Sequence, residues 1–196
     1  MTEEFISVQD RIISASIDII SDAGLASLNF KNLSLRTAIN ESMLYKYYLD
    51  TNEILVDVVK TYFMFDKAIF KTLASKNVSY IDKIEFYVDQ YGQYYNSYYS
   101  LSAVMLHYEE LLHNTHTREI VESGYLKRRS VLTELFEEAI KSKEIVDTFS
   151  AQQLADSLLG MIMLSLLNRR VMIYKKSIKD ELLSYYRTWI DTLRVK

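Results

Sequence analysis

Proline is absent from this chain of 196 residues, and glycine occurs only four times. Strands joined by tight turns draw on both residues, because proline fixes the backbone angle φ and glycine adopts the positive φ values that many turns require. We therefore expect an all-α protein. Hydrophobic residues make up 49% of the chain, which at this length allows a sizeable core in one or two domains.

The chain has no cysteine, and its formal net charge at pH 7 is −3. The lack of cysteine excludes disulfides, thiolate metal sites and a thiol nucleophile. The mild acidity argues against a protein that coats nucleic acid non-specifically, because such a coat needs a basic surface. A small local DNA-reading site remains compatible with this charge.

The N-terminal residues lack the basic start and the apolar run that are typical of a signal peptide. The longest apolar run without a charge, Ser157 to Asn168, is much shorter than the roughly 20 residues that cross a bilayer. We therefore expect a soluble, cytoplasmic protein that does not enter a membrane.

Apolar residues recur at helical spacing along almost the whole chain, and capping residues mark where helices begin. Ser7 and Gly24 are typical of the two ends of a first helix, and Asp50 with Glu53 has capping-box spacing. The pattern predicts about nine helices, over residues 8–24, 29–37, 40–48, 51 to at least 70, 79–97, 100–112, 117–143, 150–170 and 177–193.

The segment from Asn29 to Tyr48 has the dimensions of a helix-turn-helix. Two short helices meet at a tight turn around Ala38, and Asn40 caps the second. Such a unit places the first turn of its second helix in the DNA major groove. On spacing alone, a purely structural three-helix subdomain is the better interpretation, because short amphipathic helix pairs are common.

The sequence A-I-N-E-S-M-L-Y-K-Y-Y-L-D-T-N-E-I-L, residues 38–55, resembles the signature of the TetR (tetracycline-repressor-like) transcriptional regulators. The family pattern is roughly G-V-S-x-x-x-L-Y-x-Y/H-F-x-x-K-x-x-L. It is matched exactly or conservatively by Ile39, Asn40, Leu44, Tyr45, Tyr47, Tyr48, Ile54 and Leu55. The resemblance implies a helix-turn-helix DNA-binding domain over residues 1–54 and a larger helical ligand-binding and dimerisation domain over 55–196. It further implies a homodimer that binds a palindromic operator in double-stranded DNA, with repression as the expected role.

The resemblance also implies roles for single residues. Those expected to face bases are Asn40, Glu41, Ser42, Met43 and Lys46. Those expected to reach phosphates are Tyr45 and Tyr47, with charge contacts from Lys31 and Arg36 and a helix-start contact at Thr51. The packing positions of the unit would be Leu33, Ile39, Leu44 and Tyr48.

The chain departs from the family pattern where that pattern supplies positive charge. Thr51 stands in place of the usual lysine, Leu49 in place of a frequent basic residue, and Ala38 in place of the turn glycine. Between Leu28 and Leu55, three basic residues are balanced by three acidic ones. We therefore expect modest DNA affinity with a shallow salt dependence. An alternative is a helical ligand- or protein-binding dimer of the same fold whose DNA binding is weak or lost.

Half of the sixteen tyrosines lie between Tyr80 and Tyr108, and most share one face of a helix. Buried tyrosines need partners for their hydroxyls, so this face suits either a polar-lined ligand cavity or a core network. For a cavity that holds a small-molecule effector, the candidate residues are Tyr87, Tyr91, Tyr94, Tyr98, His107 and Met161.

Two C-terminal segments favour a dimer interface. Residues 155–167 are apolar on nearly every face, and the last helix carries one strong apolar stripe. The expected interface residues are Leu158, Ile162, Leu166, Tyr186, Trp189 and Leu193. Burial in the core of one protomer is the alternative.

His113 and His116 lie near two glutamates, but the intervening residues suggest a turn, so we expect solvated histidines rather than a metal site. No nucleophile elbow, phosphate loop or zinc-protease motif is present in the sequence. We therefore expect neither an enzyme nor a bound cofactor.

Overall fold

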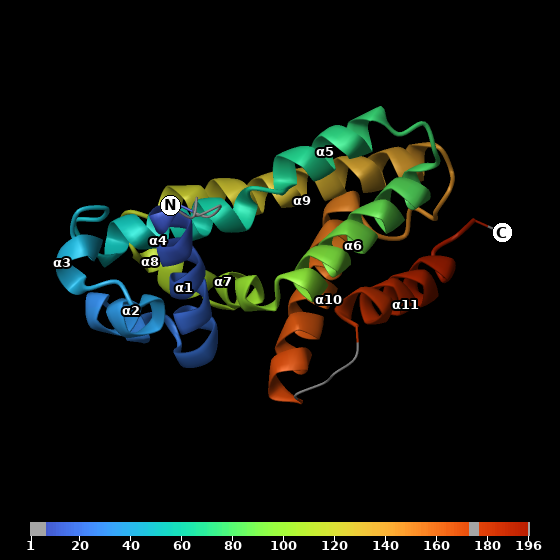
Figure 1. Cartoon of the computed structure of the whole chain (residues 1–196). Helices are drawn as coiled ribbons and strands as arrows, with labels where there is room; N and C mark the ends of the chain where they lie inside the picture. The colour runs from blue at the N-terminus through green and yellow to red at the C-terminus, as the bar shows by residue number, and fades with distance from the viewer. Residues whose placement is uncertain (1–6, 173–176, 196) are drawn as a thin grey trace. The chain divides into compact units, whose positions relative to one another are not determined.

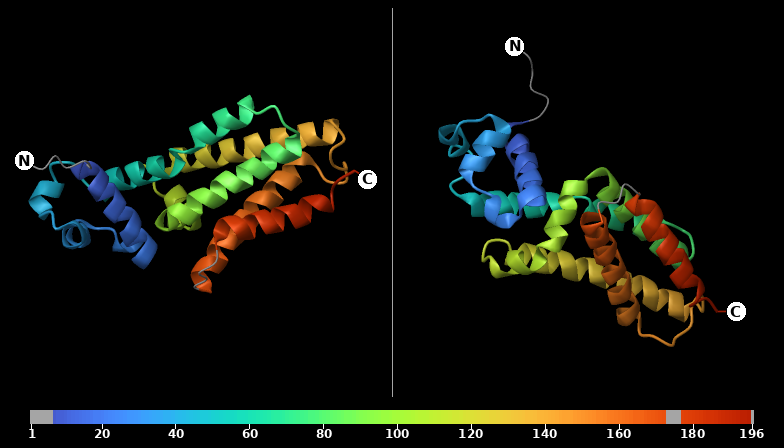
Figure 2. Two further views of the ribbon diagram at one scale, coloured as in Figure 1. Left: turned by 45° about the vertical axis from the view of Figure 1, so that its right-hand side comes forward. Right: turned by 90° about the horizontal axis from the view of Figure 1, so that it is seen from below.

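The computed structural model describes residues 7–172 and 177–195 (Figures 1 and 2). Within these ranges the protein is helical, and its only β feature is an isolated antiparallel bridge between Ile145 and Arg194. This confirms the all-α expectation. No helix of the described part is long and apolar enough to cross a membrane.

The chain divides into two compact units. Unit 1 consists of the described residues up to Met64 and of Tyr99–Glu122, and unit 2 of Phe65–Tyr98 and the described residues from Ser123 onward. Unit 1 contains α1 (Val8–Ala23), η1 (Leu25–Ser27), α2 (Phe30–Thr37), α3 (Glu41–Leu44), α4 (Thr51–Phe63), η2 (Tyr99–Leu101), α7 (Ser102–Leu106) and α8 (Tyr108–His113). Unit 2 contains α5 (Asp66–Ser75), α6 (Tyr80–Ser97), most of α9 (Arg118–Lys141), α10 (Ala151–Val171) and α11 (Ile178–Asp191).

Seven of the nine expected helix starts are confirmed by capping hydrogen bonds. Each N-cap side chain accepts from a backbone N–H of the first turn, which satisfies a donor that the helix itself leaves unpaired. The caps at the sequence-predicted starts are Ser7, Asn29, Asn40, Asp50, Ser79, Ser150 and Ser177. Ser150 and Gln153 form a complete capping box. Glu53, by contrast, accepts from the Leu49 N–H, one residue before the expected position.

Two segments expected as single helices are each divided, which is why the helices outnumber the nine predicted. The segment from residue 51 onward breaks after Phe63, where the Met64 N–H bonds to the Thr61 carbonyl, and α5 begins at Asp66. The segment from 100 to 112 breaks at His107. Neither break contains proline or glycine. The apolar spacing that runs through both segments gave no sign of them.

The core of unit 1 is formed where α1 packs against α2, α4 and α7. Ile12, Leu33, Leu44, Ile54 and Tyr62 have no exposed surface there. Burial of each such side chain contributes about 1.5–3 kcal/mol before the entropy of folding is subtracted. These five residues come from four helices and fix the orientation of α2 and α3.

In unit 2, α11 lies alongside α6 (Figures 1 and 2). Gly92 makes this close approach possible, because a Cβ there would lie only 2.8 Å from the Lys179 Cα. Tyr186 of α11 donates its hydroxyl to the Ile81 carbonyl at 2.9 Å. The Glu144 carboxylate accepts from the N–H groups of Tyr80 and Ile81, at 3.0 and 2.8 Å, and so anchors the start of α6.

Candidate DNA-reading surface and ligand groove

The turn between α2 and α3 is held by three polar contacts. Arg11 of α1 donates to the Thr37 carbonyl at 3.1 Å, and the Thr37 hydroxyl accepts from the Ile39 N–H at 3.2 Å and donates to the Leu33 carbonyl at 2.7 Å. Ala38 ends α2 in the left-handed region, with φ of 56°. The backbone therefore has the tight turn that a helix-turn-helix requires, with alanine at a position that favours glycine.

The packing side of this helix pair is buried and its opposite side is exposed. Leu33 and Leu44 have no exposed surface, Tyr48 is 4% exposed, and Ile39 is half-buried. The five residues expected to face bases are all exposed: Asn40, Glu41, Ser42, Met43 and Lys46. The structure therefore brings them together at the start of α3 and just beyond its end.

The candidate phosphate-contacting tyrosines differ in how they are held. Tyr45 stacks on Phe30 of α2, with ring centroids 4.2 Å apart and planes 8° apart, yet remains 55% exposed. Tyr47 is also exposed. Tyr48 instead donates its hydroxyl to Asp57 at 3.1 Å, and burial, followed by the effect of Asp57, raises its pKa to about 12.

Positive charge on this surface is partly neutralised within the protein. Arg36 pairs with Asp22 at 2.9 Å and lies 3.8 Å from Asp18, whereas Lys31 and Lys46 are exposed. At the start of α4 beside Thr51, the Asp50 carboxylate accepts from the N–H groups of Asn52 and Glu53, at 2.8 and 3.1 Å. These bonds, the one from Glu53 foremost, lower the pKa of Asp50. A phosphate at this helix start would therefore have to approach a carboxylate.

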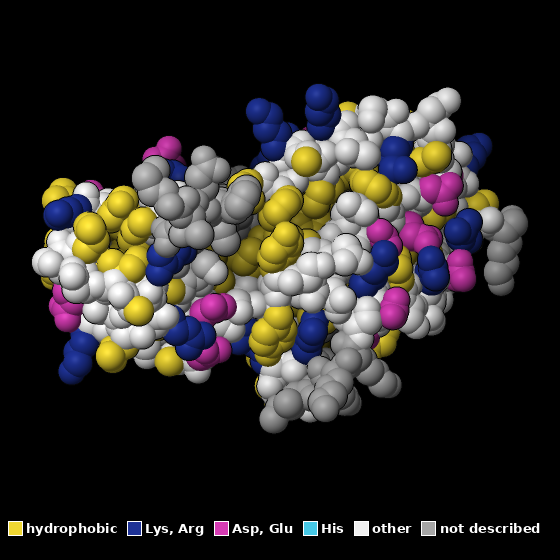
Figure 3. All heavy atoms as spheres, viewed as in Figure 1, with side chains coloured by type: hydrophobic (Ala, Val, Ile, Leu, Met, Phe, Trp, Pro, Cys, Tyr) yellow, Lys and Arg dark blue, Asp and Glu magenta, His cyan; other side chains and the backbone are white. Residues whose placement is uncertain are grey.

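Exposed apolar side chains also belong to this surface. Leu35 is 76% exposed and Leu49 is 78% exposed, and Figure 3 shows hydrophobic side chains at the surface around α3 and the start of α4. Leu49 stands where the family pattern frequently has a basic residue. The surface is thus mixed apolar and polar, with few unpaired cations.

Four of the six candidate ligand residues are not among the residues that line the groove between α5 and α6. Tyr87 and Tyr91 are buried in unit 2 with ring centroids 4.4 Å apart, and Tyr91 donates its hydroxyl to Asp66 at 2.7 Å. His107 belongs to unit 1, where its Nδ1 lies 3.3 Å from Glu110. Met161 of α10 is half-buried.

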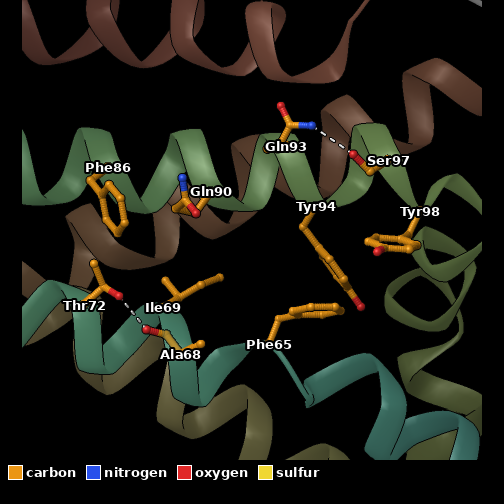
Figure 4. A pocket seen from close by; sticks show the side chains of 10 residues that line it. All are labelled: Phe65, Ala68, Ile69, Thr72, Phe86, Gln90, Gln93, Tyr94, Ser97 and Tyr98. Atoms are coloured by element: carbon orange, nitrogen blue, oxygen red, sulfur yellow. Dashed lines mark hydrogen bonds between the residues drawn. The ribbon is translucent and has the colours of Figure 1, made fainter.

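Tyr94 and Tyr98, the remaining two candidates, line a groove between α5 and α6 with a volume of about 250 Å³ (Figure 4). On the α5 side the groove is lined by Phe65, which directly precedes the helix, and by Ala68, Ile69 and Thr72. On the α6 side the other lining residues are Phe86, Gln90, Gln93 and Ser97. Figure 3 shows hydrophobic side chains in a hollow between these two helices. Burial raises the pKa of Tyr94 well above its ordinary value, so this hydroxyl remains protonated at neutral pH.

Most of the expected dimer-interface residues are buried inside unit 2. Leu158, Ile162, Leu166, Tyr186 and Leu193 are at most 6% exposed. Trp189 is half-buried and makes an edge contact with Phe136, with ring centroids 5.9 Å apart. The five buried side chains are covered by their own chain, whereas Trp189 keeps part of its surface exposed.

A different face of α10 is exposed and apolar. It carries Met163, Leu164, Leu167 and Val171, which are 45%, 56%, 45% and 69% exposed. Gly160 lies on the same face, and a Cβ there would meet no atom within 4 Å. The sequence could not distinguish this face from the buried one, because both are apolar.

The described residues contain no group of three or more His, Asp or Glu side chains placed to hold a metal ion. His116, which the sequence analysis considered with His113, lies in a turn where its N–H donates to the Asn114 side chain at 2.9 Å.

Comparison with solved structures identifies the fold. A transcriptional regulator of the TetR family from Agrobacterium tumefaciens matches with a TM-score of 0.76, at 15% identity, over 95% of this chain and 97% of that one. The chain has the TetR-family fold. The TetR-like match extends to the ketosteroid transcriptional regulator KstR2 of Mycobacterium tuberculosis, with a TM-score of 0.86 at 8% identity, covering 97% and 96% of the two chains.

A third structure with this TetR-like fold contains a ligand. The transcriptional regulator FadR from Bacillus subtilis, in complex with stearoyl-CoA, matches with a TM-score of 0.72 at 16% identity, over 90% of this chain and 96% of that one. The sequence itself matches no protein-family model and no curated protein. The resemblance carried by residues 38–55 and the fold of the described residues therefore agree.

Proposed function

We propose that this protein is a dimeric DNA-binding transcriptional regulator, acting as a repressor in the cytoplasm, whose operator binding is modulated by a small molecule. The observation that carries the proposal is the surface at the start of α3. Its polar residues are exposed, while Leu33 and Leu44 beneath them have no exposed surface. A rigidly packed helix with a free polar first turn is what base recognition in the major groove requires.

Residues at the start of α3 have side chains suited to reading bases. Asn40 can bond an adenine edge, although its Oδ1 already accepts from the Met43 N–H at 2.9 Å. The Glu41 carboxylate can accept from the amino group of cytosine, and Met43 can contact a thymine methyl group. Lys46, Lys31, Tyr45 and Tyr47 are exposed nearby and would supply the phosphate contacts that fix the register.

The exposed face of α10 supports the homodimer. A second copy packed there would cover Met163, Leu164, Leu167 and Val171, and Gly160 would allow two helices to approach closely. Two recognition surfaces related by a twofold axis bind a palindrome, because each subunit reads one half-site. The interface we propose is therefore on α10 but uses the face opposite to the one predicted from the sequence.

We further propose that residues 1–54 form the DNA-binding domain and residues 55–196 the domain for dimerisation and effector binding. The groove between α5 and α6 lies in this second domain. Bound stearoyl-CoA in the Bacillus subtilis FadR complex supports the idea that a protein of this fold responds to a small molecule. A ligand that binds two states of the dimer with different affinity would change the operator affinity by the same free energy.

Two observations favour a second candidate, a ligand- or protein-binding dimer without useful DNA affinity. Arg36 is neutralised by Asp22, and Asp50 occupies the amides at the start of α4. Both candidates are non-enzymatic.

Selection of bound sequences from random duplex DNA distinguishes the two candidates. The regulator should enrich a palindrome at low salt, and Lys46→Glu should abolish the enrichment because it reverses a charge on the reading surface. Lys67→Glu, at an exposed lysine of α5, is the matched control and should leave the enrichment intact. If the wild-type protein enriches no sequence, the second candidate replaces the regulator.

A further inference from the structure

We propose that the groove between α5 and α6 binds a compact, uncharged aromatic molecule that carries a hydrogen-bond donor such as a hydroxyl. That such a ligand regulates DNA binding rests on the proposed function. Binding to the groove can nevertheless be measured on the protein without DNA.

The volume and the lining of the groove limit the size of the ligand. Its volume is about 250 Å³, and Phe65, Ile69 and Phe86 give it an apolar lining (Figure 4). Pockets for drug-sized ligands are typically about 300–1,000 Å³. The groove therefore suits a molecule of one or two rings rather than a long acyl chain.

The lining of the groove is uncharged, which limits the charge of the ligand. All ten lining residues are described, and none is acidic or basic. Two acidic residues next in sequence to lining residues form ion pairs: Asp66 with Arg128 at 2.8 Å, and Asp89 with Lys179 at 2.9 Å. An anionic ligand would lose hydration without gaining an ion pair from the lining.

One charged group, Lys76, lies near the Phe86 end. Its Nζ is 4.3 Å from the centre of the Phe86 ring, a cation–π contact. It is not a lining residue. Binding of 2-naphthoate to the wild type and to Lys76→Ala therefore tests whether this ammonium recruits an anion.

Three rings close the opposite end of the groove. The ring centroid of Phe65 lies 5.1 Å from that of Tyr94 and 5.7 Å from that of Tyr98, with the Phe65 and Tyr98 planes 25° apart. Tyr98 is 51% exposed, so much of its surface is left for a ligand to cover. Aromatic rings at this spacing favour a further ring in an offset or edge-on position.

The polar groups of the groove favour a donor on the ligand. The Gln90 amide nitrogen donates to Asp89 at 3.0 Å, and the Gln93 amide nitrogen donates to Ser97 at 2.9 Å. The carbonyl oxygen of Gln90 has no hydrogen-bond partner among the described residues, so it can accept from a ligand hydroxyl or N–H. A phenol-like molecule satisfies this acceptor and the aromatic lining together.

Isothermal titration of the full chain with 2-naphthol, naphthalene, 2-naphthoate and stearoyl-CoA tests the proposal. We expect 2-naphthol to bind about tenfold or more tightly than 2-naphthoate and stearoyl-CoA. Gln90→Leu should remove the preference for 2-naphthol over naphthalene while naphthalene still binds. Equal or tighter binding of 2-naphthoate, especially if Lys76→Ala removes it, would overturn the uncharged class.

Ala68→Trp tests the location, because Ala68 lines the groove and a tryptophan side chain would fill it. It should weaken 2-naphthol binding about tenfold or more. Ala74→Trp, at another exposed alanine of α5 outside the groove, is the matched control and should bind as the wild type does. Unchanged affinity in Ala68→Trp, or no binding of any of the four probes to the wild type, would overturn the site.

Failure of this inference is distinguishable from failure of the proposed function. If 2-naphthol binds as described but no DNA sequence is enriched, the ligand assignment of the groove is supported and the proposed regulator is contradicted. If an operator is enriched but no probe binds in the groove, the proposed regulator is supported and the ligand assignment of the groove is contradicted.

Discussion

Arg128 and Asp66 form a bidentate ion pair in the interior of unit 2. The Nε and Nη2 atoms of Arg128 each donate to a different carboxylate oxygen of Asp66 at 2.8 Å. Tyr91 donates to the same carboxylate at 2.7 Å, and its ring centroid lies 4.7 Å from the guanidinium carbon. The pair thus fastens the first residue of α5 to α9 and α6.

Because this pair is buried, removing one partner leaves an uncompensated charge. Arg128→Ala is expected to lower the free energy of unfolding by about 3–5 kcal/mol, measured by urea denaturation. The neighbouring Arg129 pairs with Asp156 at the surface, so Arg129→Ala should lower the free energy of unfolding far less. Similar losses for the two variants would show that burial of the Asp66 pair does not govern its contribution.

Ala38 holds a left-handed backbone conformation that costs a residue with a Cβ more than it costs glycine. Ala38→Gly should therefore raise the free energy of unfolding by about 0.5–1 kcal/mol, after the larger entropy of glycine in the unfolded chain is subtracted. Ala74→Gly, within α5, is the control and should be destabilising. A loss of stability in Ala38→Gly would contradict the strain assigned to this turn.

The exposed face of α10 predicts a dimer that one charge can disrupt. Leu167→Glu should produce a monomer in sedimentation velocity, because the carboxylate would be buried between two copies without a partner. Leu126→Glu on α9 is the matched control, since Leu126 is 49% exposed and Leu167 is 45% exposed. A wild-type monomer, or a Leu167→Glu variant that remains dimeric, would exclude this face as the interface.

Buried tyrosines predict a loss of stability at alkaline pH. Burial raises the pKa of Tyr87, Tyr91, Tyr94 and Tyr186 above the ordinary value, and raises that of Tyr48 to about 12. Since the folded state favours the protonated form, the associated stability is fully present below about pH 10 and is lost as the pH rises further.

Urea denaturation at a series of alkaline pH values should show this decline in the free energy of unfolding, together with a further rise in tyrosinate absorbance when unfolding exposes the buried hydroxyls. Tyr48→Phe removes one of these ionisations and should reduce the decline between about pH 10 and about pH 12. Stability that stays constant above about pH 10 would contradict the burial assigned to these hydroxyls.

Local chemistry made the helix starts predictable. Ser7, Asn29, Asn40 and Ser79 each accept from the backbone N–H three residues ahead, so their role depends on a few neighbouring residues. Residues 38–55 were equally informative, because their pattern of packing and exposed positions is carried by a single turn and a short helix.

Long-range contacts explain what the sequence did not reveal. Asp66 and Arg128 are 62 positions apart, and no local pattern indicates that an acidic residue at the start of a helix will be buried by a distant arginine. Tyr91 and Tyr94 are only three residues apart on α6, yet Tyr91 bonds to Asp66 and Tyr94 lines the groove. On α10, periodicity could not separate Leu166, which is buried, from Leu167, which is exposed.

The most direct test of the regulator compares the affinity of the full chain for its selected palindrome with its affinity for the same duplex after one half-site is scrambled. Both affinities are measured by fluorescence anisotropy across a salt series. We predict that the palindrome binds at least about tenfold more tightly than the scrambled duplex. We also predict a shallow salt slope, because few cations on the reading surface are unpaired. Equal affinity for both duplexes at every salt concentration would contradict sequence-specific operator binding.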